Sequence, residues 1–175
     1  MEPFWVKCTE ETLEQGDLLH ECLVPVPTED FDLAAQAGGT AAIPCDVYDL
    51  VVVTQSCDLV NEPKPQFVVL CPIHHIAEFE SVNPKFKAKG AWNNVLKGRV
   101  AGLHLLASPI DPANNRKALV VDFREIYSLP YGYVMRRASA SEWRWRLRSP
   151  YLEDFSQAFA RQFMRVGLPS SIPRF

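Results

Sequence analysis

A nearly continuous apolar strand constrains this chain more than any other feature of its sequence. Residues 46–54 are largely β-branched, with Leu50-Val51-Val52-Val53 near their end. Such a run is typical of a strand that is buried on both faces. A second β-rich run, residues 66–71, follows a polar, proline-containing turn and is itself followed by Pro72. Two such runs around a short turn predict an antiparallel hairpin whose second strand ends at Pro72.

Three further segments have the pattern of strands. Residues 17–26 are mostly apolar, contain Pro25 near their end and are followed by Pro27, and residues 118–127 alternate roughly between apolar and polar. Residues 143–148, Trp-Arg-Trp-Arg-Leu-Arg, have a strict period of two. That period predicts a half-buried strand with the indoles toward the core and the arginines toward solvent.

The C-terminal segment predicts an amphipathic helix over residues 150–166. Ser149 is a good N-cap, and Pro150 suits the first helical position. A helix of this length is unstable alone in water, so it must pack against the sheet. The packing stripe is aromatic and recurs at every fourth position: Tyr151, Phe155, Phe159 and Phe163.

Together these segments predict one domain, residues 1–175, that is mainly β within the α+β class. The β core is expected at 16–73 and 118–148, and an irregular insertion at 74–117. A chain of 175 residues is typical of one domain, and a hydrophobic content of 47% suits a packed core.

The cysteines and the hydropathy predict a cytoplasmic protein without membrane association. Five cysteines is an odd number, and the start of the chain has no basic, apolar leader, so reduced thiols are expected. The longest apolar run, residues 50–53, is far shorter than the roughly 20 residues that a membrane helix needs.

Charge is distributed very unevenly along the chain. The net charge is −3, but residues 1–62 contain thirteen acidic residues and one lysine, whereas residues 136–175 contain eight arginines and three acidic residues. Either the two ends attract each other within one fold, or the basic end meets an anionic partner. Both interpretations stay open on the sequence alone.

Five polar side chains, Thr54, Gln55, Ser56, Cys57 and Asp58, directly follow the central strand. The first three could bind a ligand, while Cys57 could act as a nucleophile assisted by Asp58. The third interpretation is a structural corner whose side chains bind backbone N–H groups.

A nucleophilic Cys57 would need a base, and the histidines of the chain are the candidates. The predicted hairpin places His74 nearer residue 48 than Cys57, which counts against His74 and His75. His20 stays open as a base.

Arginines interleaved with aromatic residues suggest nucleic-acid binding near the C-terminus. Arginine binds phosphate in a fork and aromatic rings stack on bases, so the mixture suits RNA. If the indoles are buried, the arginines form a plain stripe that could pair with the acidic first third instead. The candidates are Arg136, Arg137, Arg144, Arg146 and Arg148.

A zinc site is a weaker hypothesis, and the expected state is no resident cofactor. Zinc prefers sulfur and nitrogen ligands, and the hairpin would bring Cys45 toward residues 73–75. Buried, inert thiols are the commoner state of cysteine. The weak candidates are Cys45, Cys71, His74 and His75.

The order of the first strands resembles the PemK/MazF-like group of small barrels. Gln15-Gly16-Asp17-Leu18-Leu19 is similar to the Gly-Asp that opens the first strand there, and residues 48–54 and 66–73 follow as the next two strands. The resemblance implies an SH3-like barrel with a closing helix, and a relation to bacterial toxin–antitoxin or defence proteins that act on RNA. That group has an Arg-Pro before its second strand where this chain has Ile43-Pro44, so no catalytic residue is carried over.

The resulting hypothesis is a non-catalytic or degenerate PemK/MazF-like binding module that acts with RNA or a protein partner in bacterial stress or phage defence. The alternatives are a thiol-dependent enzyme using Cys57 and a zinc-stabilised interaction domain.

Overall fold

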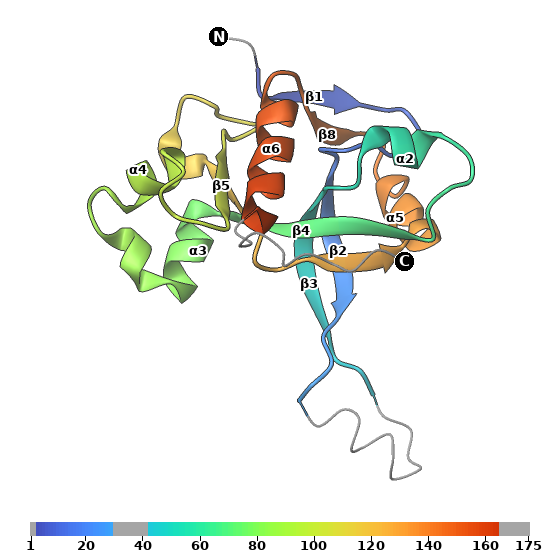
Figure 1. The fold of residues 1–175 in the computed structure, drawn as a ribbon, viewed down its shortest axis with the longest axis horizontal. Helices are drawn as coiled ribbons and strands as arrows, with labels where there is room; N and C mark the ends of the chain where they lie inside the picture. Colours follow the sequence, from blue (N-terminus) through green and yellow to red (C-terminus); the bar gives the residue numbers. More distant parts are fainter. Residues whose placement is uncertain (1–2, 30–41, 165–175) are drawn as a thin grey trace, which may run out of the picture.

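The computed structural model describes residues 3–29 and 42–164 as a mixed α+β fold in which every paired strand is antiparallel (Figure 1). The strands are β1 (Trp5–Cys8), β2 (Leu18–Pro25), β3 (Cys45–Val52), β4 (Phe67–His75), β5 (Leu103–Leu106), β6 (Leu119–Asp122), β7 (Tyr127–Pro130) and β8 (Arg144–Leu147). The helices are α2 (Ser56–Val60), α3 (Ile76–Val82), α4 (Ala91–Leu96), α5 (Tyr131–Ala138) and α6 (Tyr151–Phe163), with 3-10 turns η1 (Pro84–Lys87) and η2 (Asn115–Lys117).

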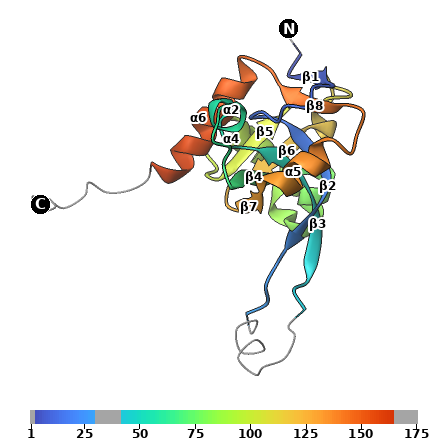
Figure 2. The ribbon, with the colours of Figure 1, turned by 90° about the vertical axis from the view of Figure 1, so that its right-hand side faces the viewer.

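The strands form two open sheets. The larger has the order β2-β3-β4-β6-β5, with β7 also paired to β4, and the smaller consists of β1 and β8. β4 is the shared strand, because its first half pairs with β7 and its second half with β6. In two perpendicular views the far ends of β2 and β3 project from the body as an arm (Figures 1 and 2).

The predicted β3–β4 hairpin is confirmed, with Val51 opposite Cys71. The predicted end of the second strand at Pro72 is wrong, because β4 runs on to His75. A proline removes only one donor from the ladder. Cys71 before it pairs with β3, while Ile73 after it pairs with β6, so the strand continues.

Burial of β3 on both faces is confirmed for the second half of the strand. Leu50 and Val52 belong to one apolar cluster, while Val51 and Val53 belong to the other. The first cluster also contains Leu59 of α2 and Val134 of α5, and the second contains Phe155 of α6. The first three residues of β3 are exposed, because they lie on the projecting arm.

The single strand predicted over 118–127 is wrong, because a turn divides it into β6 and β7. The Asp122 carboxylate accepts hydrogen bonds from the Arg124 backbone N–H at 3.0 Å and from the Arg124 side chain. Such side-chain-to-backbone bonding stabilises a turn. The turn lets both short strands pair with the same long strand, β4.

Residues 74–117 are not the predicted irregular insertion but contain α3, η1, α4, β5 and η2. They pack around a small apolar cluster of their own, which includes Phe79, Phe86 and Val95. Trp92 packs against this cluster, with its ring centroid 5.0 Å from that of Phe86. The helices α3 and α4 of this segment form a lobe beside the sheets (Figure 1), whereas β5 belongs to the larger sheet.

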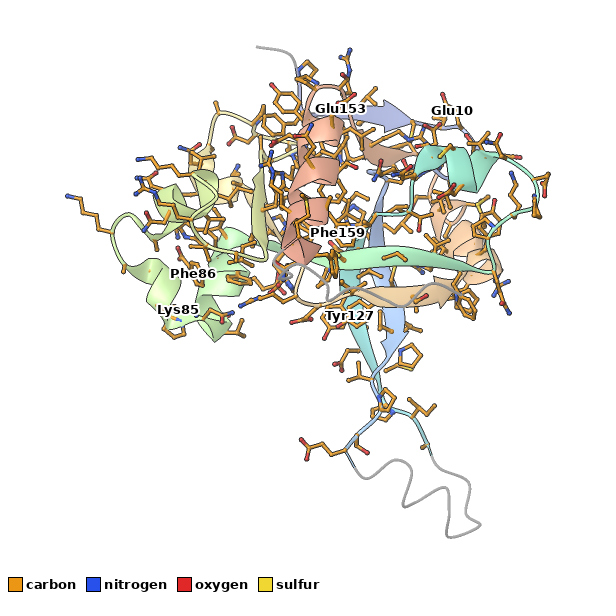
Figure 3. The ribbon with its side chains drawn as sticks, viewed as in Figure 1. Glu10, Lys85, Phe86, Tyr127, Glu153 and Phe159 are labelled. Atoms are coloured by element: carbon orange, nitrogen blue, oxygen red, sulfur yellow. The ribbon has the colours of Figure 1, made fainter. Side chains whose placement is uncertain are left out.

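The C-terminal helix is confirmed as α6, and residues 165 and 166 of the predicted range lie outside the described residues. Its Phe155 is fully buried, and Phe159 packs against the same cluster over the sheet (Figure 3). The predicted cap at Ser149 is wrong: the helix begins one residue later than expected, so Pro150 is the N-cap and no side chain caps it. Within residues 3–29 and 42–164, no helix has the length and apolar character to cross a membrane.

Candidate functional site

The polar corner after β3 uses two of its side chains to hold the fold. The Thr54 hydroxyl accepts a hydrogen bond from the Val69 N–H at 2.7 Å, and the Ser56 hydroxyl accepts one from the Gln15 N–H at 3.1 Å. The first bond ties the corner to β4, and the second ties it to the turn before β2. These bonds agree with the structural interpretation of this corner.

Cys57 and Asp58 are exposed on α2, whose single turn begins at Ser56. The Cys57 Sγ lies 3.5 Å from the Asp58 carboxylate and 3.6 Å from the Gln55 side-chain oxygen. The Gln55 amide oxygen is not a base, and the negative charge of the Asp58 carboxylate disfavours the thiolate, whereas an activated thiol lies beside an imidazole or a cation. Among the described residues, no hydrogen bond joins Cys57 to an imidazole.

Two of the five arginines proposed for nucleic-acid binding are buried, which corrects the solvent-facing stripe expected from the alternation of β8. Arg144 and Arg146 reach the fully buried Asp17 carboxylate, with Nε–O distances of 2.8 and 2.5 Å. Arg146 also pairs with Glu10 at 2.9 Å and with Glu14 at 2.7 Å. Of the two interpretations of the charge distribution, these two side chains therefore follow the first, because they pair with acidic residues of the first third of the chain.

The remaining arginine candidates are dispersed. Arg136 and Arg148 are exposed, on α5 and after β8. Arg137 is half-buried and donates to the His20 carbonyl at 2.6 Å. The structure therefore does not gather the five arginines into one surface.

Strand β8 is buried on both faces, which corrects the predicted half-buried strand. Trp145 and Leu147 pack against the apolar cluster that contains Phe155, as predicted for the indole face, while Arg144 and Arg146 are buried on the opposite face. Trp143 is 39% exposed, and its ring meets that of Trp145 edge to face, with centroids 5.3 Å apart. The Lys7 ammonium sits 3.9 Å from the Trp143 ring centroid. An alternating pattern defines two faces but does not say whether the polar face is also buried.

The four weak metal candidates do not form one site. Cys71 is buried opposite Val51, whereas Cys45 is exposed at the start of β3, six positions further along the strand. Within the described parts of the chain, no group of three or more histidine, cysteine, aspartate or glutamate side chains is placed to hold a metal ion.

Three histidines line one pocket of about 410 Å³, here called the histidine pocket. His20 comes from β2, and His74 and His75 come from the end of β4. Asp49 of β3 and Glu78 of α3 supply carboxylates to the same pocket. Sequence reasoning missed this site because the register of β2, β3 and β4 creates it.

A hydrogen bond joins two of the residues that line the pocket, His20 and Asp49. His20 Nδ1 lies 2.8 Å from the Asp49 carboxylate, which also accepts from the Glu21 N–H at 2.9 Å. The bond to Asp49 raises the pKa of His20 above its ordinary value. Burial alone would raise the pKa of Asp49, but the bonds from His20 and Glu21 outweigh it and lower that pKa.

The unpaired positive charge of the described chain is concentrated on the lobe. Between Glu80 and Asp111 the sequence has no acidic residue. The five cations of this stretch are exposed, and within residues 3–29 and 42–164 none of them forms an ion pair. These side chains, here called the basic lobe, are Lys85, Lys87, Lys89, Lys97 and Arg99. Figure 3 shows Lys85 and Phe86 on this part of the molecule, away from α6.

A second pocket, of about 790 Å³ and mostly apolar, is lined in part by α4, the helix that directly precedes Lys97 of the basic lobe. Trp92 and Leu96 of α4 line it, together with Arg116 and residues of the segment 105–115. The orientation of the Trp92 indole is held by a hydrogen bond, because its Nε1–H donates to the buried Glu80 carboxylate at 2.8 Å. Arg116 binds the same carboxylate through both terminal nitrogens, at 2.9 and 2.8 Å. The ring and the guanidinium are thus held at the pocket by one anchor.

No family model, curated protein or solved structure matches the chain.

Proposed function

We propose that this chain is a PemK/MazF-like binding module for single-stranded RNA, acting in bacterial stress or defence without catalysing a reaction. The proposal includes an SH3-like barrel as the arrangement of the antiparallel strands, which is what the resemblance implies. The order of the first strands and the closing helix α6 support that part.

The observation that carries the RNA proposal is the basic lobe. Five exposed cations lie within fifteen residues of sequence, from Lys85 to Arg99, with no carboxylate among them. Lysine and arginine side chains that lack internal partners are available to neutralise phosphates, which is the dominant source of affinity for nucleic acids. The buried pair Arg144 and Arg146 is unavailable for this purpose, since Asp17 already neutralises it.

The apolar pocket lined in part by α4 supplies a place for an unstacked base. Trp92 gives the pocket an aromatic ring, and stacking of a base on such a ring is worth about 1–3 kcal/mol. Every base has a π-face, so this contact favours single strands without fixing the sequence. In this proposal the cations of the basic lobe bind the phosphates of the RNA, and the Trp92 ring stacks on one of its bases.

The test is fluorescence anisotropy of a labelled single-stranded RNA of mixed sequence. Reversing Lys85, Lys87 and Lys89 to glutamate should weaken binding by at least ten-fold at low salt, because each removed phosphate contact weakens binding. Trp92→Leu should weaken binding by about five-fold or more, the equivalent of about 1 kcal/mol of lost stacking.

The control compares Lys87, which forms no ion pair with the described residues, with Lys64, which pairs with Glu62 at 3.7 Å and donates to the Val60 carbonyl. Lys87→Glu should weaken RNA binding, whereas Lys64→Glu, in the β3–β4 turn, should leave it within two-fold of the parent protein. Equal effects from both reversals would mean that net charge, and not the lobe, decides binding. That result would overturn the proposed site.

A further inference from the structure

The histidine pocket has a charge opposite to that of the basic lobe. Its lining includes the carboxylates of Asp49 and Glu78 and contains no lysine or arginine. Glu78 keeps the pocket negative while His20 is protonated, and Asp49 adds a second negative charge once His20 loses its proton, so a cation is the complementary ligand. This observation goes beyond RNA binding, since phosphate would be repelled here.

Aromatic rings complete the complementarity. Tyr48, Trp143 and Trp145 line the pocket, and the faces of such rings attract cations. Lys7 already places its ammonium 3.9 Å from the Trp143 ring centroid and 5.3 Å from that of Trp145. These indoles therefore accept a cation within the chain itself, beside the pocket they line.

The rim of the pocket favours a side chain carried by a polypeptide over a free small cation. Val47 is 61% exposed and Ile110 is 83% exposed, and both line the pocket. These two side chains add apolar surface beside a pocket whose rings, Tyr48, Trp143 and Trp145, are of the types enriched where proteins bind one another. We infer that the histidine pocket binds an arginine or lysine side chain of a partner protein, with apolar residues beside that side chain resting on Val47 and Ile110.

The imidazole of His20 makes this binding depend on pH. Protonated His20 neutralises Asp49, and loss of its proton leaves the pocket more negative. Binding of a cation should therefore tighten as pH rises through the titration of His20, whereas binding of an anion should weaken. The groups that face His20 and Asp49 from the packed elements are Glu21, Arg137, His74, His75 and Glu78.

Calorimetric titration with three capped peptides tests the inference. The peptides are Leu-Arg-Leu, the same peptide with neutral citrulline in place of arginine, and Gly-Arg-Gly. The first should bind most tightly, and it should bind about three-fold or more tightly at high pH than at pH 5.5, because the imidazole charge that neutralises Asp49 is lost as the pH rises. Citrulline should weaken binding at least ten-fold, and loss of the leucines should weaken it by a smaller factor.

Two variants locate the site without disturbing the core. Glu78→Gln removes an exposed pocket carboxylate, and Trp143→Ala removes an exposed ring; they should weaken the Leu-Arg-Leu peptide about three-fold and five-fold. Glu153→Gln, an exposed glutamate of α6 that does not line the pocket, is the matched control and should have no effect.

Several results would overturn the inference. Equal binding of the citrulline peptide, tighter binding at low pH, equal effects of Glu78→Gln and Glu153→Gln, or no binding of any peptide at millimolar concentration would each do so. Binding of inorganic phosphate in the pocket would also contradict it. Tighter binding of free arginine amide than of Leu-Arg-Leu would show that the pocket binds a free small cation and not a side chain of a partner protein. RNA affinity is measured separately, so failure here leaves the basic lobe untouched.

Discussion

Replacing Asp17 with asparagine should destabilise the fold more than any other isosteric change in the first third of the chain. The carboxylate is fully buried and accepts from the Glu14 N–H at 3.0 Å as well as from Arg144 and Arg146. It joins the segment before β2 to strand β8, which lies far away in the sequence. Asparagine keeps the shape of the side chain but removes the charge that balances two buried guanidinium groups.

The magnitude follows from what remains after the substitution. Removing one partner of a buried ion pair lowers the free energy of unfolding by about 3–5 kcal/mol, because the charge of the other partner stays buried. Arg146 would keep Glu10 and Glu14, while Arg144 would keep only carbonyl oxygens, so the lower end is expected. A loss of about 3 kcal/mol corresponds to a fall in Tm of about 6–12 °C for a chain of this size. Burial would lower the pKa of Arg146, but Asp17 outweighs it and raises that pKa, so the guanidinium stays charged.

Urea unfolding followed by circular dichroism measures the effect. The midpoint should fall while the slope m stays constant, because the folded and unfolded surfaces are unchanged. Glu11→Gln is the control: Glu11 is exposed on the same segment, and its replacement should change the free energy of unfolding by less than about 0.5 kcal/mol. A loss below about 1 kcal/mol for Asp17→Asn would refute the view that this network ties β8 to the chain's beginning.

Two further predictions concern ionisable groups elsewhere. Hydrogen bonds from Arg116 and Trp92 lower the pKa of Glu80 from 4.5 to about 2, so its stabilising contribution is complete above pH 4.5 and disappears as pH falls toward 2. Glu80→Gln should therefore be less stable at neutral pH and should lose less stability than the parent protein on acidification; an unchanged acid profile in unfolding curves would count against the anchor. Alkylation of the native protein, read by mass spectrometry, should label two thiols quickly and three slowly, because burial raises the pKa of Cys22 to about 11 and of Cys71 to about 12. The fast pair is Cys45 and Cys57, the slow group is Cys8, Cys22 and Cys71, and rapid labelling of Cys57 well below the pH at which Cys45 reacts would revive a catalytic role for it.

Local sequence patterns predicted the elements whose partners are near in the chain. The β3–β4 hairpin needs only two apolar runs and a turn, and α6 needs only its aromatic stripe, so both were accessible. The continuous apolar character of residues 50–53 also predicted burial on both faces correctly. The break between β6 and β7 was missed because it depends on the pairing of both with β4, in addition to the local bonds of Asp122.

The burial of the arginine face of β8 could not be predicted from its alternation. Tryptophan is ordinarily the better core residue, and arginine is rarely buried without a partner. Here the partner is Asp17, which lies 127 residues before Arg144, and only the tertiary fold brings the two together. The histidine pocket was hidden for the same reason. The basic lobe, by contrast, carried a signal in the sequence: thirty residues, 81–110, without one carboxylate.

The salt dependence of RNA binding tests the central claim most directly. With all five cations of the basic lobe on phosphates, the logarithm of the association constant should fall with the logarithm of salt concentration at a slope of about −3.5. Reversal of Lys85, Lys87 and Lys89 should reduce that slope by about 2, to roughly −1.5. A slope near zero in the parent protein, or the same slope in both proteins, would contradict RNA binding through the lobe.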